Sequence, residues 1–153
     1  MLDLSNMFFM DHGLKIVIWN VRGLNSRARR IAIRSLILTT GASIICFQET
    51  KMETIYTSTI LEALGSDYDD YVYLPAISTR GGILLAWKSR EVTITDQTFM
   101  TNTLSARVST PSSATAPWWL TVVYGPQHDD VSLGIPLAWP GQGLDAIGYL
   151  QDS

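Results

Sequence analysis

A strand–helix–strand pattern near the start of the chain is the feature that most limits how it can fold. Residues 15–20 (KIVIWN) are short, β-branched and aromatic, which is typical of a buried strand. A helix is predicted over residues 27–40, with Ser26 as its N-cap and Gly41 as its C-cap. A second buried strand follows at residues 43–48 (SIICFQ). This βαβ unit predicts parallel strands, a right-handed crossover and an α/β fold.

The first helix is predicted to bury a wide apolar face against these strands. The residues of this face are Ile31, Ile33, Ser35, Leu36, Ile37 and Leu38. A second helix is predicted over residues 53–65, where Gly65 acts as a stop. Five short strands then follow at close spacing, which predicts an antiparallel meander. They cover residues 70–74, 82–87, 92–99, 103–109 and 118–124.

The two ends of the chain differ from this central part. Residues 1–13 are interpreted as an N-terminal extension. Residues 125–153 contain three Pro and five Gly and offer no strand candidate, only a weak helix over residues 144–151. Residues 108–153 also hold four acids and no base. We therefore expect residues 131–153 to be a disordered tail, and an out-of-frame or spliced origin is one hypothesis for it.

Composition excludes several classes of protein. The single cysteine, Cys46, rules out an internal disulfide framework and a cysteine-based zinc site, and two histidines rule out a histidine-rich metal cage. No apolar run approaches membrane-spanning length, and acids stand where a signal peptide carries bases. We therefore expect a soluble intracellular protein. The net charge of −3 argues against a strongly basic nucleic-acid binder, and no phosphate-loop or dinucleotide motif indicates a small-molecule cofactor.

Polar residues that follow predicted strands are the candidates for chemistry. Asn20 ends the first strand and Glu49 follows the second, so parallel pairing would place both at one carboxyl edge. An amide oxygen beside a carboxylate suits Mg²⁺. Tyr124 ends the last predicted strand, where its phenol could bind a phosphate. Read singly, each is better explained by ordinary turn or strand-end chemistry.

A cluster of bases offers a further candidate site, for phosphate or DNA contact. Its members are Arg22, Arg27, Arg29 and Arg30, with Arg34 nearby. The alternative is that these arginines form the solvated face of a helix.

Four segments in this order resemble the endonuclease/exonuclease/phosphatase superfamily, and more narrowly the endonuclease domain of plant LINE-type retrotransposons. They are KIVIWNVRGLNSRARR, IICFQETKM, GGILLAWK and WWLTVVYGPQHDD, and the resemblance covers residues 14–130. It implies the N-terminal part of a four-layer α/β sandwich, with two mixed sheets flanked by helices. It also implies Mg²⁺-dependent hydrolysis of DNA phosphodiesters and, if the chain acts like the family, a nuclear location. Asn20 and Glu49 would hold the metal, and Tyr124 would contact the scissile phosphate.

Two motifs that the resemblance calls for are absent after Tyr124. No Asp-x-Asn pair and no terminal Asp-His pair follow it, and Asp11–His12 precedes the first strand. The strands that would complete the second sheet are not evident either. We therefore expect a truncated domain that has lost its activity. An active Mg²⁺-dependent nuclease and a small non-catalytic α/β interaction module stay open as alternatives, and the sequence leaves the oligomeric state open.

Overall fold

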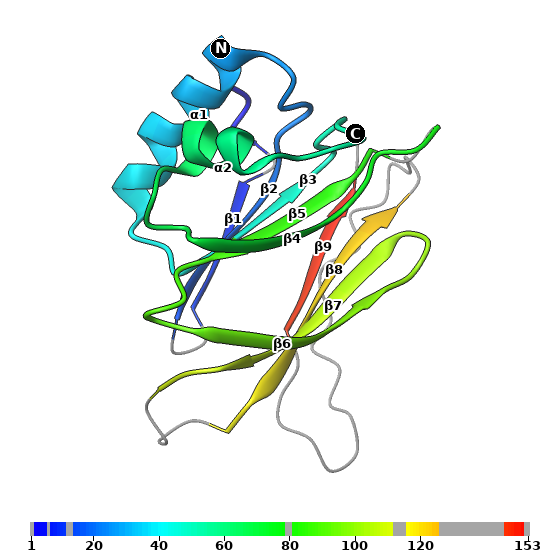
Figure 1. The fold of residues 1–153 in the computed structure, drawn as a ribbon. Coiled ribbons are helices and arrows are strands. Elements are labelled where there is room, and N and C mark those ends of the chain that lie inside the picture. The colour runs from blue at the N-terminus through cyan, green and yellow to red at the C-terminus, as the bar shows by residue number, and fades with distance from the viewer. Residues whose placement is uncertain are drawn as a thin grey trace.

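In the computed structural model, residues 2–5, 7–11, 14–78, 81–111, 116–125 and 146–151 are described. Two β-sheets pack face to face, and both helices cover the outer face of the first sheet (Figure 1). The first sheet has the strand order β1-β2-β3-β5-β4 and the second β6-β7-β8-β9. The elements are β1 (Met7–Asp11), β2 (Lys15–Asn20), α1 (Arg27–Thr40), β3 (Ile44–Gln48), α2 (Thr57–Leu64), β4 (Asp70–Leu74), β5 (Ile83–Trp87), β6 (Thr93–Phe99), β7 (Thr103–Ser109), β8 (Trp118–Gly125) and β9 (Ala146–Gln151).

The α/β prediction is confirmed. Strands β2 and β3 are parallel, with Asn20 opposite Gln48 at their carboxyl ends. Helix α1 begins and ends where predicted: the Ser26 hydroxyl accepts a hydrogen bond from the Arg29 N–H, and Gly41 adopts the left-handed conformation at φ 64°. With both helices on one sheet, the described residues form three layers of the predicted four-layer sandwich.

The predicted apolar face of α1 is wrong in part. Ile33 and Ile37 are buried, but Ile31 and Leu38 are 48% and 57% exposed. Side chains on an α-helix turn by about 100° per residue, so Ile31 lies roughly 200° around the helix from Ile33. A narrow stripe spaced three to four residues apart fills the contact with the sheet, and the opposite side stays in solvent.

Helix α2 is shorter than the predicted 53–65. The backbone before it is engaged elsewhere, because the carbonyl of Met52 accepts a hydrogen bond from the N–H of Ala76 at 2.9 Å. Ile55 precedes the helix and is nevertheless buried, whereas Leu61 within the helix is exposed. The apolar residues of this segment were therefore sufficient to predict a helix but not its first turn. Neither helix in the described part of the chain has the length and apolar character needed to cross a membrane.

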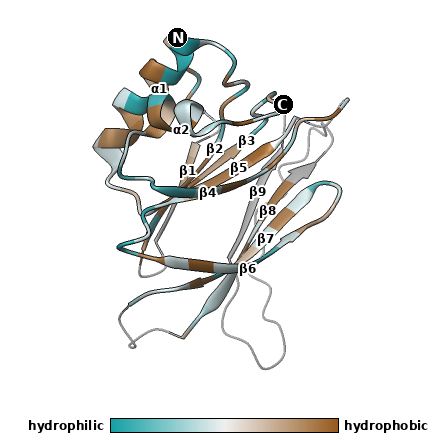
Figure 2. Cartoon of the chain, in the orientation of Figure 1, coloured by the Kyte–Doolittle hydropathy of each residue, from teal (hydrophilic) through white to brown (hydrophobic). Residues whose placement is uncertain are grey.

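The five predicted strands form, but not as one meander. Strand β5 enters the first sheet between β3 and β4 and is buried along its whole length, whereas β6, β7 and β8 begin the second sheet. Figure 2 shows β5 as largely hydrophobic, which fits a central strand covered on both faces. The chain crosses from one sheet to the other in the turn after Trp87.

Two strands were not predicted. Residues 7–11 form β1, which pairs antiparallel with β2, although the sequence suggested an N-terminal extension there. Residues 146–151 form β9, which pairs parallel with β8, so the predicted weak helix over 144–151 is wrong. In both cases an open edge of an existing strand supplies hydrogen-bond partners that local propensity does not reveal. Residues 126–145 lie outside the described residues.

The core has two parts, one on each face of the first sheet. Alternate residues of β2 separate them: Ile16 and Ile18 face the second sheet, while Val17 and Trp19 face the helices. Trp19 makes an edge-to-face contact with Phe47 at a centroid distance of 5.9 Å. Cys46, which faces the second sheet, is fully buried, and burial raises the pKa of its thiol.

A buried phenol makes stability depend on alkaline pH. Burial, aided by the carboxylates of Glu91 and Asp67, raises the pKa of Tyr68 to about 12, and its hydroxyl donates to the carbonyl of Ala42 at 2.6 Å. The neutral phenol is favoured in the folded state, so this stabilisation is complete below pH 10 and is lost as pH rises through about 12. We expect the free energy of unfolding to fall by at most about 1.4 kcal/mol per pH unit in that window.

Urea denaturation at several pH values from neutral to alkaline measures this slope. Tyr68→Phe is the control, because it keeps the ring and removes the titrating group. An equal alkaline slope in that variant would assign the effect to other groups.

Candidate active site

Parallel pairing continues past the ends of β2 and β3 and aligns the two segments that follow. The N–H groups of Val21, Gly23 and Leu24 donate to the carbonyls of Gln48, Glu49 and Thr50, at 3.1, 2.8 and 2.9 Å. This ladder places Asn20 and Glu49 at the same edge of the sheet, as predicted from the sequence. Open α/β sheets build their sites at this edge.

The backbone at this edge is held in an unusual conformation. Arg22, Glu49 and Lys51 have φ values of 54°, 57° and 57°, and they are three of the five non-glycine residues with positive φ in the described part of the chain. Each such residue costs about 1–3 kcal/mol. Strain of this kind persists where the surrounding structure enforces it, and it concentrates at functional sites. The two loops after β2 and β3 are therefore the strongest candidate for a site.

Both oxygen-bearing side chains of this pair are buried at the edge. The Glu49 residue is 7% exposed, and its Oε1 lies 3.3 Å from the Lys51 ammonium. The Asn20 Oδ1 accepts a hydrogen bond from the N–H of Arg22 at 3.2 Å. Each oxygen thus has a donor or a cation beside it, and both are hard ligands of the kind Mg²⁺ prefers.

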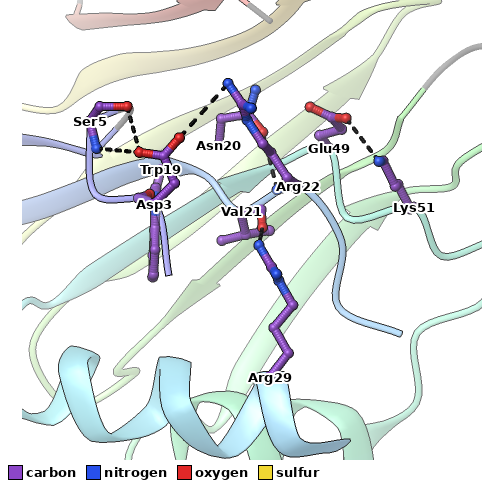
Figure 3. Close-up of polar contacts among 9 residues, drawn as sticks. All are labelled: Asp3, Ser5, Trp19, Asn20, Val21, Arg22, Arg29, Glu49 and Lys51. Atoms are coloured by element: carbon purple, nitrogen blue, oxygen red, sulfur yellow. Dashed lines mark hydrogen bonds and ion pairs between the residues drawn. The ribbon is translucent and has the colours of Figure 1, made fainter. Parts of the chain in front are cut away.

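The N-terminal segment reaches this site, which the sequence did not indicate. Figure 3 shows the Arg22 guanidinium extending toward the Asp3 carboxylate, at a distance of 4.0 Å. The Asp3 carbonyl accepts a hydrogen bond from the indole of Trp19 at 3.0 Å. Hydrogen bonds from the hydroxyl and N–H of Ser5, with a smaller contribution from Arg22, lower the pKa of Asp3. Asp3 is therefore an anion beside Arg22 at neutral pH, and no local pattern in residues 1–13 could have placed it there.

Two of the clustered arginines hold the loop that follows β2. Arg29 donates to the carbonyl of Val21 and Arg30 to that of Leu24, each at 2.6 Å. Arg30 also pairs with Glu62 at 3.2 Å, and Arg27, whose side chain is 78% exposed, pairs with the same carboxylate at 3.0 Å. The geometry of Arg29 and Arg30 thus supports the loop, while contact of the arginines with phosphate stays a prediction.

The loop after β3 rests on a pair of glycines. The N–H of Lys51 donates to the carbonyl of Gly81 at 2.6 Å, and the N–H of Thr50 to that of Gly82 at 3.3 Å. Gly82 has φ 87°, and a Cβ placed on it would lie 2.5 Å from the Thr50 hydroxyl oxygen. Glycine is required here by conformation and by close approach alike. These glycines therefore fix the position of the loop that carries Glu49.

The second sheet reaches the same edge through Gln48. Its Nε2 donates to the carbonyl of Val123 in β8 at 2.7 Å. Tyr124 is the next residue of β8, so its backbone lies at this end of the sandwich. Gln48 was not among the site residues predicted from the sequence. Its position, directly before Glu49 at the end of an otherwise apolar strand, is nevertheless a visible signal.

The described residues fit a magnesium site in part. Among them, no three His, Cys, Asp or Glu side chains group closely enough to hold a metal ion. Asn20 and Glu49 offer two buried oxygens at one edge, and Mg²⁺ commonly takes one or two carboxylates and completes its shell with water and phosphate oxygens. The donor set is therefore of the kind that Mg²⁺ prefers, and it supplies two protein oxygens.

Two packed sheets with a polar cluster at one end define an α/β sandwich. The family described as Endonuclease/Exonuclease/phosphatase family matches residues 17–141, and the chain belongs to that family. The match extends beyond residue 130, where the resemblance noted in the sequence ends. A comparison with curated protein sequences finds no match.

Solved structures share this fold at low sequence identity. The human Nocturnin catalytic domain, solved with bound sulfate, has a TM-score of 0.58 and 13% identity, over 84% of this chain and 56% of that one. A functionally unknown conserved protein from Enterococcus faecalis has a TM-score of 0.50 and 14% identity, over 71% and 51%. ANGEL2, a 2′,3′-cyclic phosphatase, has a TM-score of 0.50 and 13% identity, over 81% and 43%. The chain thus spans about half the length of the structures it matches.

Proposed function

We propose that this chain carries the half of a Mg²⁺-dependent phosphodiester hydrolase site that holds the metal. The observation that supports this most is that Asn20 and Glu49 place buried oxygens at one edge of the sheet, where the loops after β2 and β3 are aligned and strained. The proposed substrate class is DNA, and the proposed origin is the endonuclease domain of a LINE-type retrotransposon. Family membership and the fold support the first of these, and the WNVRG, QETK and VYGP segments support the second.

The residues of the site have separate roles in this proposal. Asn20 and Glu49 would hold the ion, and Glu49 would exchange its contact with Lys51 for the metal. When bound, Mg²⁺ offsets negative charge on the phosphate oxygens. Arg22 and Tyr124 would contact the phosphate, with Arg27 on the adjoining exposed surface, and Arg29 and Arg30 would act through the loop they support.

We propose further that these 153 residues bind metal without turning over substrate. After Tyr124 the sequence has neither an Asp-x-Asn pair nor an Asp-His pair. A positioned general acid or base contributes about 10²–10⁴ in rate, and a polar group that stabilises the transition state contributes a similar factor. The residues proposed for this site include contacts to the phosphate but no general acid or base.

Titration calorimetry with Mn²⁺ and Mg²⁺ tests the metal site. We expect Glu49→Gln to weaken binding roughly tenfold or more, because it removes the charge that attracts the cation. Glu53→Gln is the matched control: Glu53 is an exposed carboxylate four residues away, and its loss should leave the affinity unchanged. Equal affinity in wild type and Glu49→Gln would contradict the proposal.

A plasmid-nicking assay with Mg²⁺ tests the absence of turnover. We expect no cleavage by the 153-residue chain. Cleavage that Glu49→Gln abolishes would show an active nuclease instead. If the chain folds cooperatively but binds no metal, a non-catalytic interaction module becomes the better account.

A further inference from the structure

Gln48 ends a row of apolar residues that faces the second sheet. Ile44 and Cys46 precede it on that face of β3, and Ile16, Ile18 and Asn20 form the neighbouring row on β2. Gln48 is 1% exposed, so it lies in the interior rather than at a solvated strand end. An amide side chain therefore occupies a place where the pattern of the strand calls for another aliphatic residue.

The orientation of this amide is determined by its partner. The Val123 carbonyl can only accept, so the group that faces it at 2.7 Å is the Nε2 donor. Among the described residues, Oε1 has no hydrogen-bond partner and is buried. A buried polar atom without a partner costs about 1–3 kcal/mol. A purely structural role is therefore better served by an apolar side chain, and the amide needs a different explanation.

The hydrogen bond to Val123 acts on the residue that follows. The carbonyl of Val123 and the backbone nitrogen of Tyr124 belong to one planar peptide unit. A hydrogen bond that holds the carbonyl therefore also holds the nitrogen of Tyr124. Tyr124 follows Val123 directly in β8. Glu49 follows Gln48 directly on the other sheet. Gln48 thus joins the backbone beside the candidate metal ligand to the backbone beside the candidate phosphate contact.

We propose that Gln48 is a positioning residue that sets Tyr124 relative to Glu49 across the two sheets. This rests on the proposed function in one respect, namely that Tyr124 acts at the site. The geometric statement is independent of metal or activity. Loss of the Gln48 donor should displace Tyr124 while the fold stays intact.

Fluorine NMR of the 153-residue chain labelled with 3-fluorotyrosine tests the proposal. Tyr124→Phe assigns the Tyr124 resonance among the six tyrosines. In Gln48→Met, which keeps the length of the side chain and removes the donor, we expect this resonance to shift. The other tyrosine resonances should stay in place. An unchanged Tyr124 resonance would overturn the proposal.

A control separates positioning from general stability. Thr40→Val also removes a buried hydroxyl hydrogen bond, to Ile37 at 2.7 Å, but it lies toward the start of β3, away from Gln48. In Thr40→Val we expect no change of the Tyr124 resonance, and the same displacement would contradict a specific role for Gln48.

Gln48→Leu serves as a second variant if Gln48→Met folds poorly. If Glu49→Gln leaves metal binding unaffected while Gln48→Met still displaces Tyr124, the proposed function fails and the positioning role stands.

Discussion

Replacing Gly82 with alanine is expected to lower the free energy of unfolding by about 2–4 kcal/mol. The left-handed φ of 87° strains any residue with a Cβ, and that Cβ would lie 2.5 Å from the Thr50 hydroxyl oxygen and 3.0 Å from the nitrogen of Ala76. Backbone forms part of this contact, so a change of side-chain rotamer alone does not relieve it. The loop that holds Glu49 must shift, and we expect metal affinity to fall together with stability.

Gly41→Ala provides the matched control. Gly41 also has a positive φ, of 64°, but a Cβ there meets nothing within 4 Å. Its replacement should cost about 1–2 kcal/mol from conformation alone and leave metal binding intact. Urea denaturation and calorimetry of both variants measure the difference. Equal losses of stability would mean that the contact with Thr50 contributes nothing.

Replacing Trp19 with alanine is expected to cost about 3–5 kcal/mol, the largest effect of any single substitution considered. Trp19 is buried in the core beneath the helices, makes an edge-to-face contact with Phe47 and donates its indole N–H to the carbonyl of Asp3. The substitution leaves a cavity and also releases the segment that brings Asp3 to Arg22. The chain should melt at a lower temperature, and residues 2–5 should exchange their amide protons faster.

Phe9→Ala is the comparison for Trp19→Ala. Phe9 belongs to β1 in the same sheet, but its ring is mostly exposed. We expect a change within about 0.5 kcal/mol, as for other surface positions. Thermal unfolding followed by circular dichroism distinguishes the two variants. A Trp19→Ala variant as stable as Phe9→Ala would show that the aromatic contact adds little to the core.

Local signals were sufficient for the elements at the centre of the fold. The strands at residues 15–20 and 44–48 and the helix between them carry their own periodicity, cap and stop, and these agree with the final packing. The face of α1 was harder to predict, because Ile31 and Leu38 satisfy a helical pattern as well as Ile33 and Ile37 do. Only the position of the sheet decides which of them are buried.

The parts of the structure that could not be predicted from the sequence depend on partners outside the segment itself. Strand β1 exists because β2 offers it an edge, and β9 because β8 does. The same holds at the site. The proximity of Asn20 and Glu49 follows from the parallel pairing of neighbouring strands and was predictable. The placement of Asp3 at Arg22 and of Gln48 at Val123 arises from tertiary packing that no short motif encodes.

The bond between Gln48 and Val123 joins residues 75 positions apart, and this separation has a consequence for the order in which the protein assembles. The ladder that aligns Asn20 with Glu49 joins strands close in the chain, so it can form while the chain is still being synthesised. The end of β8 can close onto it only after more than seventy further residues have left the ribosome. Under the proposed function, the two candidate metal ligands would therefore be aligned before the second sheet is in place, and the Gln48 bond can form only once both sheets are present.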